Sequence, residues 1–169
     1  MRLRFALLVA VTSVLTVLSP AAAGPVHASP AHAGPAHAAG AHTAAGDWAY
    51  VQHELYGVPL GTFLAHTRTG DRWFDWSTDY CSAPLVGNTG LSFDFRGSCR
   101  RHDFGYRNLR LLDRRYGGGY WNATNRRRVD QQFQADMKLH CRGRAVWLQP
   151  SCFSWAETYY TAVRLWGGP

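Results

Sequence analysis

Two neighbouring residues near the middle of the chain, His102 and Asp103, are of types that could carry out hydrolytic chemistry. They follow Cys99 in the run CRRHDFGYRN, which is compatible with a helix. Neighbouring side chains on a helix point about 100° apart, so these two residues would serve two adjacent points rather than one. Histidine can act as a base and a carboxylate can bind a metal ion. The dipeptide therefore predicts a hydrolytic site in two parts.

Two apolar stripes at helical spacing each contain a polar residue. One stripe consists of Phe95, Cys99, His102, Tyr106 and Leu109, and the other, on a helix starting near Thr124, of Asp130, Phe133, Met137 and Cys141. A buried carboxylate needs a partner, and antiparallel packing of the two helices would make His102 the partner of Asp130. That contact would fix the imidazole tautomer and leave the other ring nitrogen as a base. A purely structural His–Asp hydrogen bond explains the stripes equally well.

Further helices are predicted on either side of this pair. A short amphipathic helix carries Trp48, Val51 and Leu55 and ends at Gly57 and Pro59, and residues 63–76 read as a loop with short helical turns. A third strong helix extends from about Cys152 to Trp166, with Trp155, Tyr159, Ala162, Val163 and Trp166 on one stripe. Alternating strand patterns are scarce. We therefore expect a mainly α fold, a small helical bundle in which two long antiparallel helices carry the His/Asp site.

The N-terminal part of the chain has the composition of an export signal and a linker. Residues 1–23 combine a basic start, an apolar run from Phe5 to Leu18 and a small-residue cleavage site at Ala21–Ala23, which predicts a signal peptide. Residues 24–46 consist almost entirely of Ala, Gly, Pro and His and cannot form a core. A flexible linker or pro-segment is favoured there over a metal-binding histidine tract. The catalytic domain is expected at 47–169.

The positive charge of the chain favours partners that carry phosphate. The formal net charge is +7, and loss of Arg2 and Arg4 with the signal peptide would leave 16 basic and 11 acidic residues, a net charge of +5. Such a charge is compatible with nucleic acid, an anionic membrane or phospholipid as partner. It does not discriminate between these three classes.

All four cysteines lie in the predicted domain, and an even number in an exported chain favours two disulfides. Of the three possible pairings, the sequence-adjacent ones are favoured because each would join a loop to a helix. These pairs are Cys81 with Cys99 and Cys141 with Cys152. A zinc site is the weaker alternative, since no CxxC pair occurs.

A cluster of oxygen ligands is predicted beside the first cysteine pair. A Cys81–Cys99 bridge, one turn before His102, would draw Asp79 and the carbonyl of Tyr80 toward Asp103. Two carboxylates with backbone carbonyls and water are ligands that calcium prefers. Without that bridge, the simpler interpretation is that Asp79 caps a turn and that Asp103 is a solvated surface acid.

Several of these motifs together resemble the secreted phospholipase A2 family of bacteria and fungi. They are FDWSTD at 74–79, RHDFGYRN at 101–108, and RVD at 128–130 followed by Phe133, Asp136, Met137 and Cys141. The last helix, with Trp155, Tyr159, Tyr160, Ala162 and Val163, is also similar to that of the family. The resemblance covers the chain from about Trp73 to Gly167.

The resemblance implies a secreted, extracellular, calcium-dependent enzyme that hydrolyses the sn-2 ester of glycerophospholipids to a fatty acid and a lysophospholipid. By motif, His102 would be the general base and Asp130 its orienting carboxylate. Calcium would be bound by Asp79, the Tyr80 carbonyl and Asp103, and the disulfides of the family match the two sequence-adjacent pairs. We expect a monomer that acts on phospholipid membranes or micelles and binds no nucleic acid.

Some features depart from the family pattern or leave alternatives open. Tyr80 replaces a commoner aliphatic residue, and residues 114–121 look longer than usual and should bulge as a loop. The sequon at residues 122–124 reads more plainly as a helix start with Asn122 or Thr124 as the N-cap. Candidates for lipid contact, each equally compatible with the core, are Trp73, Trp76, Tyr120 and Trp121. The alternative functions are a cationic nucleic-acid-binding protein or His-dependent metal nuclease, and a non-catalytic membrane-active protein of the same fold.

Overall fold

The computed structural model describes residues 42–82 and 93–167, so the predicted signal peptide and residues 24–41 of the predicted linker lie outside the described residues. Within the described ranges the chain is helical and contains no β-strand, which confirms the prediction of a mainly α fold. No helix in this part of the chain is long and apolar enough to cross a bilayer. The helices are α1 (Ala44–Gln52), η1 (a π-helical turn, His53–Gly57), α2 (Leu60–His66), α3 (Arg96–Tyr116), α4 (Ala123–Arg142), η2 (a 3-10 turn, Val146–Leu148) and α5 (Gln149–Trp166).

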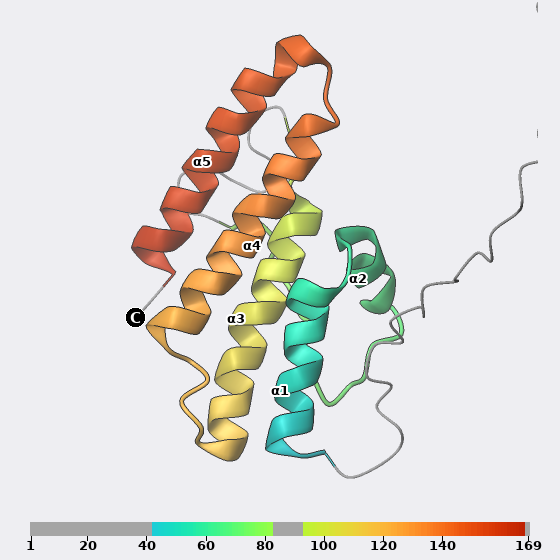
Figure 1. The fold of residues 1–169 in the computed structure, drawn as a ribbon, viewed down its shortest axis with the longest axis vertical. Coiled ribbons are helices and arrows are strands. Elements are labelled where there is room, and N and C mark those ends of the chain that lie inside the picture. Colours follow the sequence, from blue (N-terminus) through green and yellow to red (C-terminus); the bar gives the residue numbers. More distant parts are fainter. Residues whose placement is uncertain (1–41, 83–92, 168–169) are drawn as a thin grey trace, which may run out of the picture. The chain divides into compact units, whose positions relative to one another are not determined.

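The three longest helices, α3, α4 and α5, form a row that carries the predicted site. Figure 1 shows α4 between α3 and α5, with each neighbour running antiparallel to it. Residues 117–122 connect α3 to α4, and residues 143–148 connect α4 to α5. Such short connections leave consecutive helices antiparallel, so the predicted arrangement of the two long helices is confirmed.

The junction between α3 and α4 is fixed by a glycine and an asparagine. Gly117 has a φ of 63°, in the left-handed region that favours glycine, and its N–H donates to the carbonyl of Asp113 at 2.8 Å. The side chain of Asn122 accepts from the N–H of Asn125 at 2.9 Å, which confirms its role as an N-cap. The loop is shorter than predicted, because residues 114–116 continue α3.

Helix α1 is anchored through a buried carboxylate. Thr43 is its N-cap, so residues 44–46 of the predicted linker segment are helical. Asp47 is fully buried and accepts hydrogen bonds from His42 Nδ1 at 2.8 Å, Trp73 Nε1 at 2.5 Å and the Tyr116 hydroxyl at 2.8 Å. These bonds join the start of α1 to the segment after α2 and to the end of α3.

The prediction of a loop with short helical turns over residues 63–76 did not identify α2, which contains the first four of these residues. In α2, Phe63 is fully buried and its ring lies 5.5 Å from that of Phe104. No side chain caps the N-terminus of this seven-residue helix. Its stability therefore depends on tertiary packing, which local sequence signals do not report.

Two disulfides join loops to the long helices in the sequence-adjacent pairing. Cys81 is bonded to Cys99 on α3, with a Cα–Cα distance of 5.3 Å, and Cys141 at the end of α4 to Cys152 on α5, at 5.5 Å. The first disulfide holds residues 77–81 beside α3. The second closes the connection between α4 and α5.

A glycine allows the close approach of α3 to α4 beside the predicted site. A Cβ atom built on Gly105 would lie 2.7 Å from Val129 Cγ1 and 3.0 Å from Leu55 Cδ2, closer than real Cβ contacts. Gly105 is one turn after His102, and Val129 precedes Asp130. The absence of a side chain at position 105 therefore lets the two helices bring these residues together.

Replacing Gly105 with alanine should lower the free energy of unfolding by about 1–3 kcal/mol, because the methyl group must displace Val129 or Leu55 from a packed position. Chemical denaturation measures this change. Gly61→Ala on α2 is the matched control, since a Cβ there meets nothing within 4 Å. It should leave stability unchanged or raise it by up to about 1 kcal/mol through helix propensity. A Gly105→Ala protein as stable as the Gly61→Ala protein would contradict the close approach.

Candidate active site

His102 is held on α3 between two parts of the hydrophobic core. Its ring centroid lies 4.2 Å from that of Tyr106 and 4.9 Å from that of Phe133. Its Nε2 lies 2.9 Å from Oδ1 of Asp130 on α4, as the two stripes predict. Because a carboxylate accepts the Nε2 proton, the neutral ring carries no proton on Nδ1. This nitrogen is then available as a base, and His102 lines a pocket.

Asp130 is fully buried and accepts hydrogen bonds from three side chains. Besides His102, the hydroxyl of Tyr106 donates to Oδ1 at 2.7 Å, and Nη1 of Arg164 donates to Oδ2 at 2.6 Å. Burial by itself would raise the pKa of Asp130, but the hydrogen bonds from His102, Arg164 and Tyr106 outweigh burial and lower that pKa. The carboxylate therefore remains charged beside the imidazole.

Sequence reasoning identified His102 and Asp130 but missed two of these donors. Tyr106 lies on the same apolar stripe as His102, so helical periodicity could have indicated that both side chains face Asp130. Arg164 precedes Leu165 on α5, and nothing in the local pattern links it to Asp130. Its contact depends on how α5 packs against α4.

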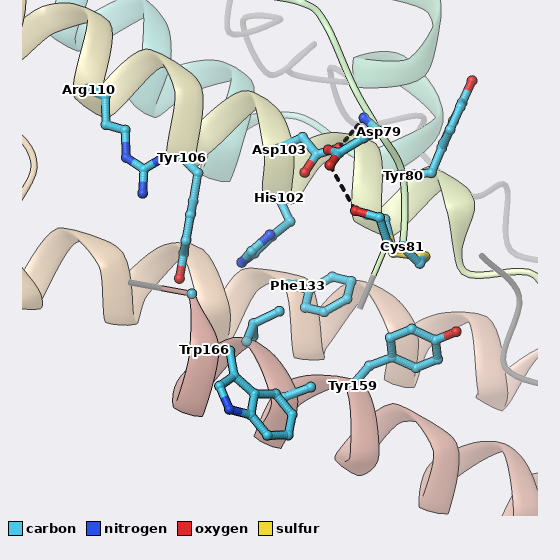
Figure 2. Close-up of a pocket in the computed structure, with 15 residues that line it drawn as sticks. Asp79, Tyr80, Cys81, His102, Asp103, Tyr106, Arg110, Phe133, Tyr159 and Trp166 are labelled. Carbon is cyan, nitrogen blue, oxygen red and sulfur yellow. Dashed lines mark hydrogen bonds between the residues drawn. A yellow bond between two sulfur atoms is a disulfide. The ribbon is translucent and has the colours of Figure 1, made fainter. Parts of the chain in front are cut away.

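Asp79 and Asp103 lie together at one end of the pocket, as predicted from the Cys81–Cys99 disulfide (Figure 2). Oδ2 of Asp103 accepts hydrogen bonds from the Thr78 hydroxyl at 2.5 Å and from the N–H of Asp79 at 3.2 Å. Burial raises the pKa of Asp103, and the negative charge of Asp79 raises it further. Two carboxylates with this mutual repulsion favour binding of a cation between them.

The side chain of Asp79 is also engaged on its exposed side. Ser82 donates to its Oδ2 at 2.8 Å and Arg107 to its Oδ1 at 2.9 Å. The hydrogen bond from Ser82, which outweighs the effect of burial, and the contact with Arg107 lower the pKa of Asp79. The side chain of Asp79 is 60% exposed, and an ion pair this exposed contributes only about 0–1 kcal/mol. It does not prevent Asp79 from turning toward a cation.

Tyr80, between these ligands and the disulfide, has an unusual backbone. Its φ of 57° is the one positive φ at a non-glycine residue in residues 42–82 and 93–167. A left-handed conformation costs roughly 1–2 kcal/mol for such a residue, so the surrounding contacts must hold it. Its N–H donates to the Thr78 hydroxyl at 3.0 Å, while the residue is 40% exposed. The strained segment thus lies at the site itself.

The pocket has a polar end and an apolar wall, with His102 between them. It has a volume of about 350 Å³, within the usual range for small-molecule sites. Figure 2 shows Asp79 and Asp103 on one side of His102, and Phe133, Tyr159 and Trp166 on the other. Further lining residues are Tyr80, Cys81, Ser82, Cys99, Tyr106, Arg110, Ala162, Val163 and Gly167. The arrangement suits a substrate with a charged group at one end and an apolar chain at the other.

The described ranges contain no cluster of three or more His, Cys, Asp or Glu side chains that could hold a metal ion. A cation at the polar end would therefore need backbone carbonyls or water in addition to the two carboxylates. Such a donor set, made only of oxygen, suits calcium and does not suit zinc.

Comparisons with known proteins agree with this geometry. The prokaryotic phospholipase A2 family matches residues 51–167, a range that contains every residue of the pocket. A secretory phospholipase A2 of Beauveria bassiana (strain ARSEF 2860) is 35% identical over 115 residues, which are 68% of this chain and 55% of that relative. A secretory phospholipase A2 of Arthroderma benhamiae (strain ATCC MYA-4681 / CBS 112371) is 35% identical over 114 residues, 65% of this chain and 72% of that relative. The match thus spans about half the length of the Beauveria protein. The chain belongs to the prokaryotic phospholipase A2 family.

Proposed function

We propose that this protein is a secreted, calcium-dependent phospholipase A2 that releases the sn-2 fatty acid of glycerophospholipids. The observation that carries the proposal is the hydrogen bond from His102 to Asp130, which leaves Nδ1 as a base beside a pocket with a carboxylate pair at one end. Membership of the family and the relatives named as secretory enzymes support the same reaction and export from the cell.

His102 would act as a general base on water. Its Nδ1 accepts a proton from a water molecule, whose oxygen attacks the carbonyl carbon of the ester. As the tetrahedral intermediate collapses, the imidazolium returns the proton to the oxygen of the departing lysophospholipid. Asp130 stabilises the imidazolium throughout, because its buried charge lies 2.9 Å from Nε2.

The pocket offers no activated side-chain nucleophile. Cys81 and Cys99 are joined in a disulfide, and the hydroxyl of Ser82 donates to Asp79 rather than to His102. An attacking water is therefore the simplest nucleophile for this site, and no covalent acyl-enzyme is required.

Asp79, the backbone carbonyl of Tyr80 and Asp103 would hold the calcium ion. Both carboxylates line the pocket, and their repulsion would be relieved by a divalent cation. A bound calcium ion would polarise the ester carbonyl, stabilise the oxyanion and bind the substrate phosphate.

The apolar wall would hold an acyl chain. It is formed by Phe133 from α4 and by Tyr159, Ala162, Val163 and Trp166 from α5. A pocket with this wall suits a lipid ester better than a nucleotide, so it favours the lipase over the nuclease.

Replacing His102 with alanine should lower fatty acid release from phosphatidylcholine or phosphatidylglycerol by about 10²–10⁴-fold, the usual contribution of a general base. Removal of calcium with a chelator should stop the reaction as well. Fatty acid release in a continuous titration assay measures both. His53→Asn is a matched control, because His53 lies in η1 and outside the pocket. Full activity of His102→Ala, or of the wild type in chelator, would refute the proposal.

Calcium binding can be tested without turnover. Isothermal titration should show one calcium ion bound per chain, and Asp103→Asn should weaken that affinity by at least tenfold because one charged ligand is lost. Asp113→Asn is the matched control, since Asp113 caps the loop after α3 through the N–H groups of Tyr120 and Trp121. Equal calcium affinity of the Asp103→Asn and Asp113→Asn proteins would place the ion elsewhere.

Arg164 should act as a positioning residue for Asp130. Replacing it with methionine removes a charge-assisted hydrogen bond to a buried carboxylate, so kcat should fall roughly ten- to a hundredfold with little change in KM. Arg164→Lys should restore part of kcat, since lysine keeps the charge. Arg127→Met, at an exposed position near the start of α4, is the control. Equal kcat values for the methionine and lysine variants at position 164 would show that the charge at this position does not matter.

A further inference from the structure

The connection between α4 and α5 exposes apolar side chains that the fold does not use. Val146, Trp147 and Leu148 form the 3-10 turn η2, and they are 77%, 81% and 42% exposed. Leu139, on the last turns of α4, is 61% exposed. We call residues 142–148 the α4–α5 tip; it lies at the end of α4 and α5 that is uppermost in Figure 1. A contiguous group of exposed apolar residues marks an interaction site more often than single ones do.

The tip is held in a defined conformation. The disulfide between Cys141 and Cys152, both fully buried, closes its base. The side-chain amide of Gln149 donates to the carbonyls of Arg142 at 3.3 Å and Arg144 at 3.0 Å. The disulfide and these hydrogen bonds therefore hold the turn in a conformation in which its apolar side chains are exposed to solvent.

The charges carried by the tip itself are positive, and the nearby acidic residue Asp94, whose charge acts on His140, is paired with Arg96. Arg142 and Arg144 are exposed on the tip, and no acidic residue occurs between Asp136 and Glu157. Arginines beside exposed tryptophan and aliphatic side chains fit a surface that has anionic phosphates over an apolar interior. We propose that the α4–α5 tip binds the surface of an anionic phospholipid bilayer, with Trp147 inserted at the headgroup level and the two arginines on phosphates.

A protein partner or a second copy fits the tip less well. A stable protein interface buries roughly 800 Å² on each side. One turn with three apolar side chains offers only a few hundred Å², since even an aromatic side chain buries about 150–250 Å². A bilayer needs no such area, because a small apolar wedge and adjacent cations are enough for reversible attachment.

The sequence-based candidates for lipid contact lie elsewhere and are mostly packed. Trp76, Tyr120 and Trp121 pack against the core between α1, α2 and α3, and the ring of Trp73 stacks at 4.2 Å on that of His42. These four residues are therefore less available for lipid contact than Trp147, which is 81% exposed.

The tip is also distant from the pocket. It adjoins the first residue of α5, whereas Trp166, which lines the pocket, is the last residue of that helix. Along α5, Tyr159 is about 15 Å and Trp166 about 25 Å from the first residue of the helix, and both line the pocket. The inference deepens the proposed function, since it names where the enzyme would rest on aggregated substrate, but binding by the tip does not require hydrolysis.

The test measures binding to vesicles of phosphatidylglycerol and of phosphatidylcholine by co-sedimentation. All proteins carry His102→Ala and are kept in a chelator, so that the lipid stays intact, and all are purified from the medium of a secreting host with the same N-terminus. The parent should bind phosphatidylglycerol vesicles, and added salt should weaken binding. Trp147→Ala with Leu148→Ala should lower the affinity at least tenfold. Arg142→Gln with Arg144→Gln should lower it about thirtyfold at low salt, roughly fivefold for each arginine.

The matched control removes the same charge at the far ends of the helices. Arg114→Gln with Arg127→Gln should change the affinity by less than threefold, because these exposed arginines lie near the end of α3 and the start of α4. Trp147→Phe should retain most of the binding but lose part of the tryptophan quenching caused by brominated lipid. Thermal unfolding of each variant verifies that the fold is intact.

Three results would overturn the proposal. They are a parent protein that does not bind anionic vesicles, tip variants that bind as the parent does, and an equal loss in the Arg114/Arg127 control. Sedimentation equilibrium of the same proteins tests for self-association. A dimer that Trp147→Ala abolishes would assign the tip to contact with a second copy of the chain instead of a bilayer. If the protein binds vesicles but the wild type has no phospholipase activity, the proposal for the tip stands and only the proposed reaction is refuted.

Discussion

The buried charge of Asp130 determines how the three long helices of this protein must be arranged. Removing a carboxylate from water costs several kcal/mol unless partners compensate. Those partners come from both neighbouring helices, His102 and Tyr106 from α3 and Arg164 from α5. The folded state is therefore favoured only when α3 and α5 both lie against α4 in positions that supply these donors. The hydrogen bond to His102 also fixes the imidazole in one tautomer, so one set of contacts both compensates the buried charge and leaves Nδ1 of His102 without a proton.

A second constraint places the polar end of the pocket beside His102. Residues 77–81 make few regular backbone hydrogen bonds, and the Cys81–Cys99 disulfide holds them beside α3. The left-handed conformation of Tyr80 and the contact of the Asp79 N–H with Asp103 both lie within this attached segment. The charge of Asp79 raises the pKa of Asp103, and the disulfide, which is covalent, holds the segment in place despite this repulsion. Folding thus brings Asp79 and Asp103, from segments far apart in the chain, to the same end of the pocket.

Sequence periodicity predicted the parts of the site that depend on one helix face. His102 and Asp130 are polar residues on apolar stripes, and a mutual contact lowers the free-energy cost of burying them. The disulfide pairing extended the prediction to Asp79 and Asp103. Arg164 could not be predicted in this way, because its partner depends on the rotation and position of α5 against α4. Helix α2 was not predicted as a helix because no side chain caps its N-terminus. The burial of Phe63, which stabilises it, depends on tertiary packing. The exposure of the turn at Trp147 was not predicted either, since apolar residues in a sequence are expected to lie in the core.

The most direct measurement for the central claim is the regiochemistry of hydrolysis. A phosphatidylcholine with acyl chains of different mass at sn-1 and sn-2 is incubated with the enzyme and calcium, and both products are identified by mass spectrometry. The account predicts that the sn-2 chain appears as free fatty acid and the sn-1 chain stays in the lysophospholipid, and that substitution of His102 abolishes both products. Release of the sn-1 chain, or sn-2 release that persists without His102, would contradict it.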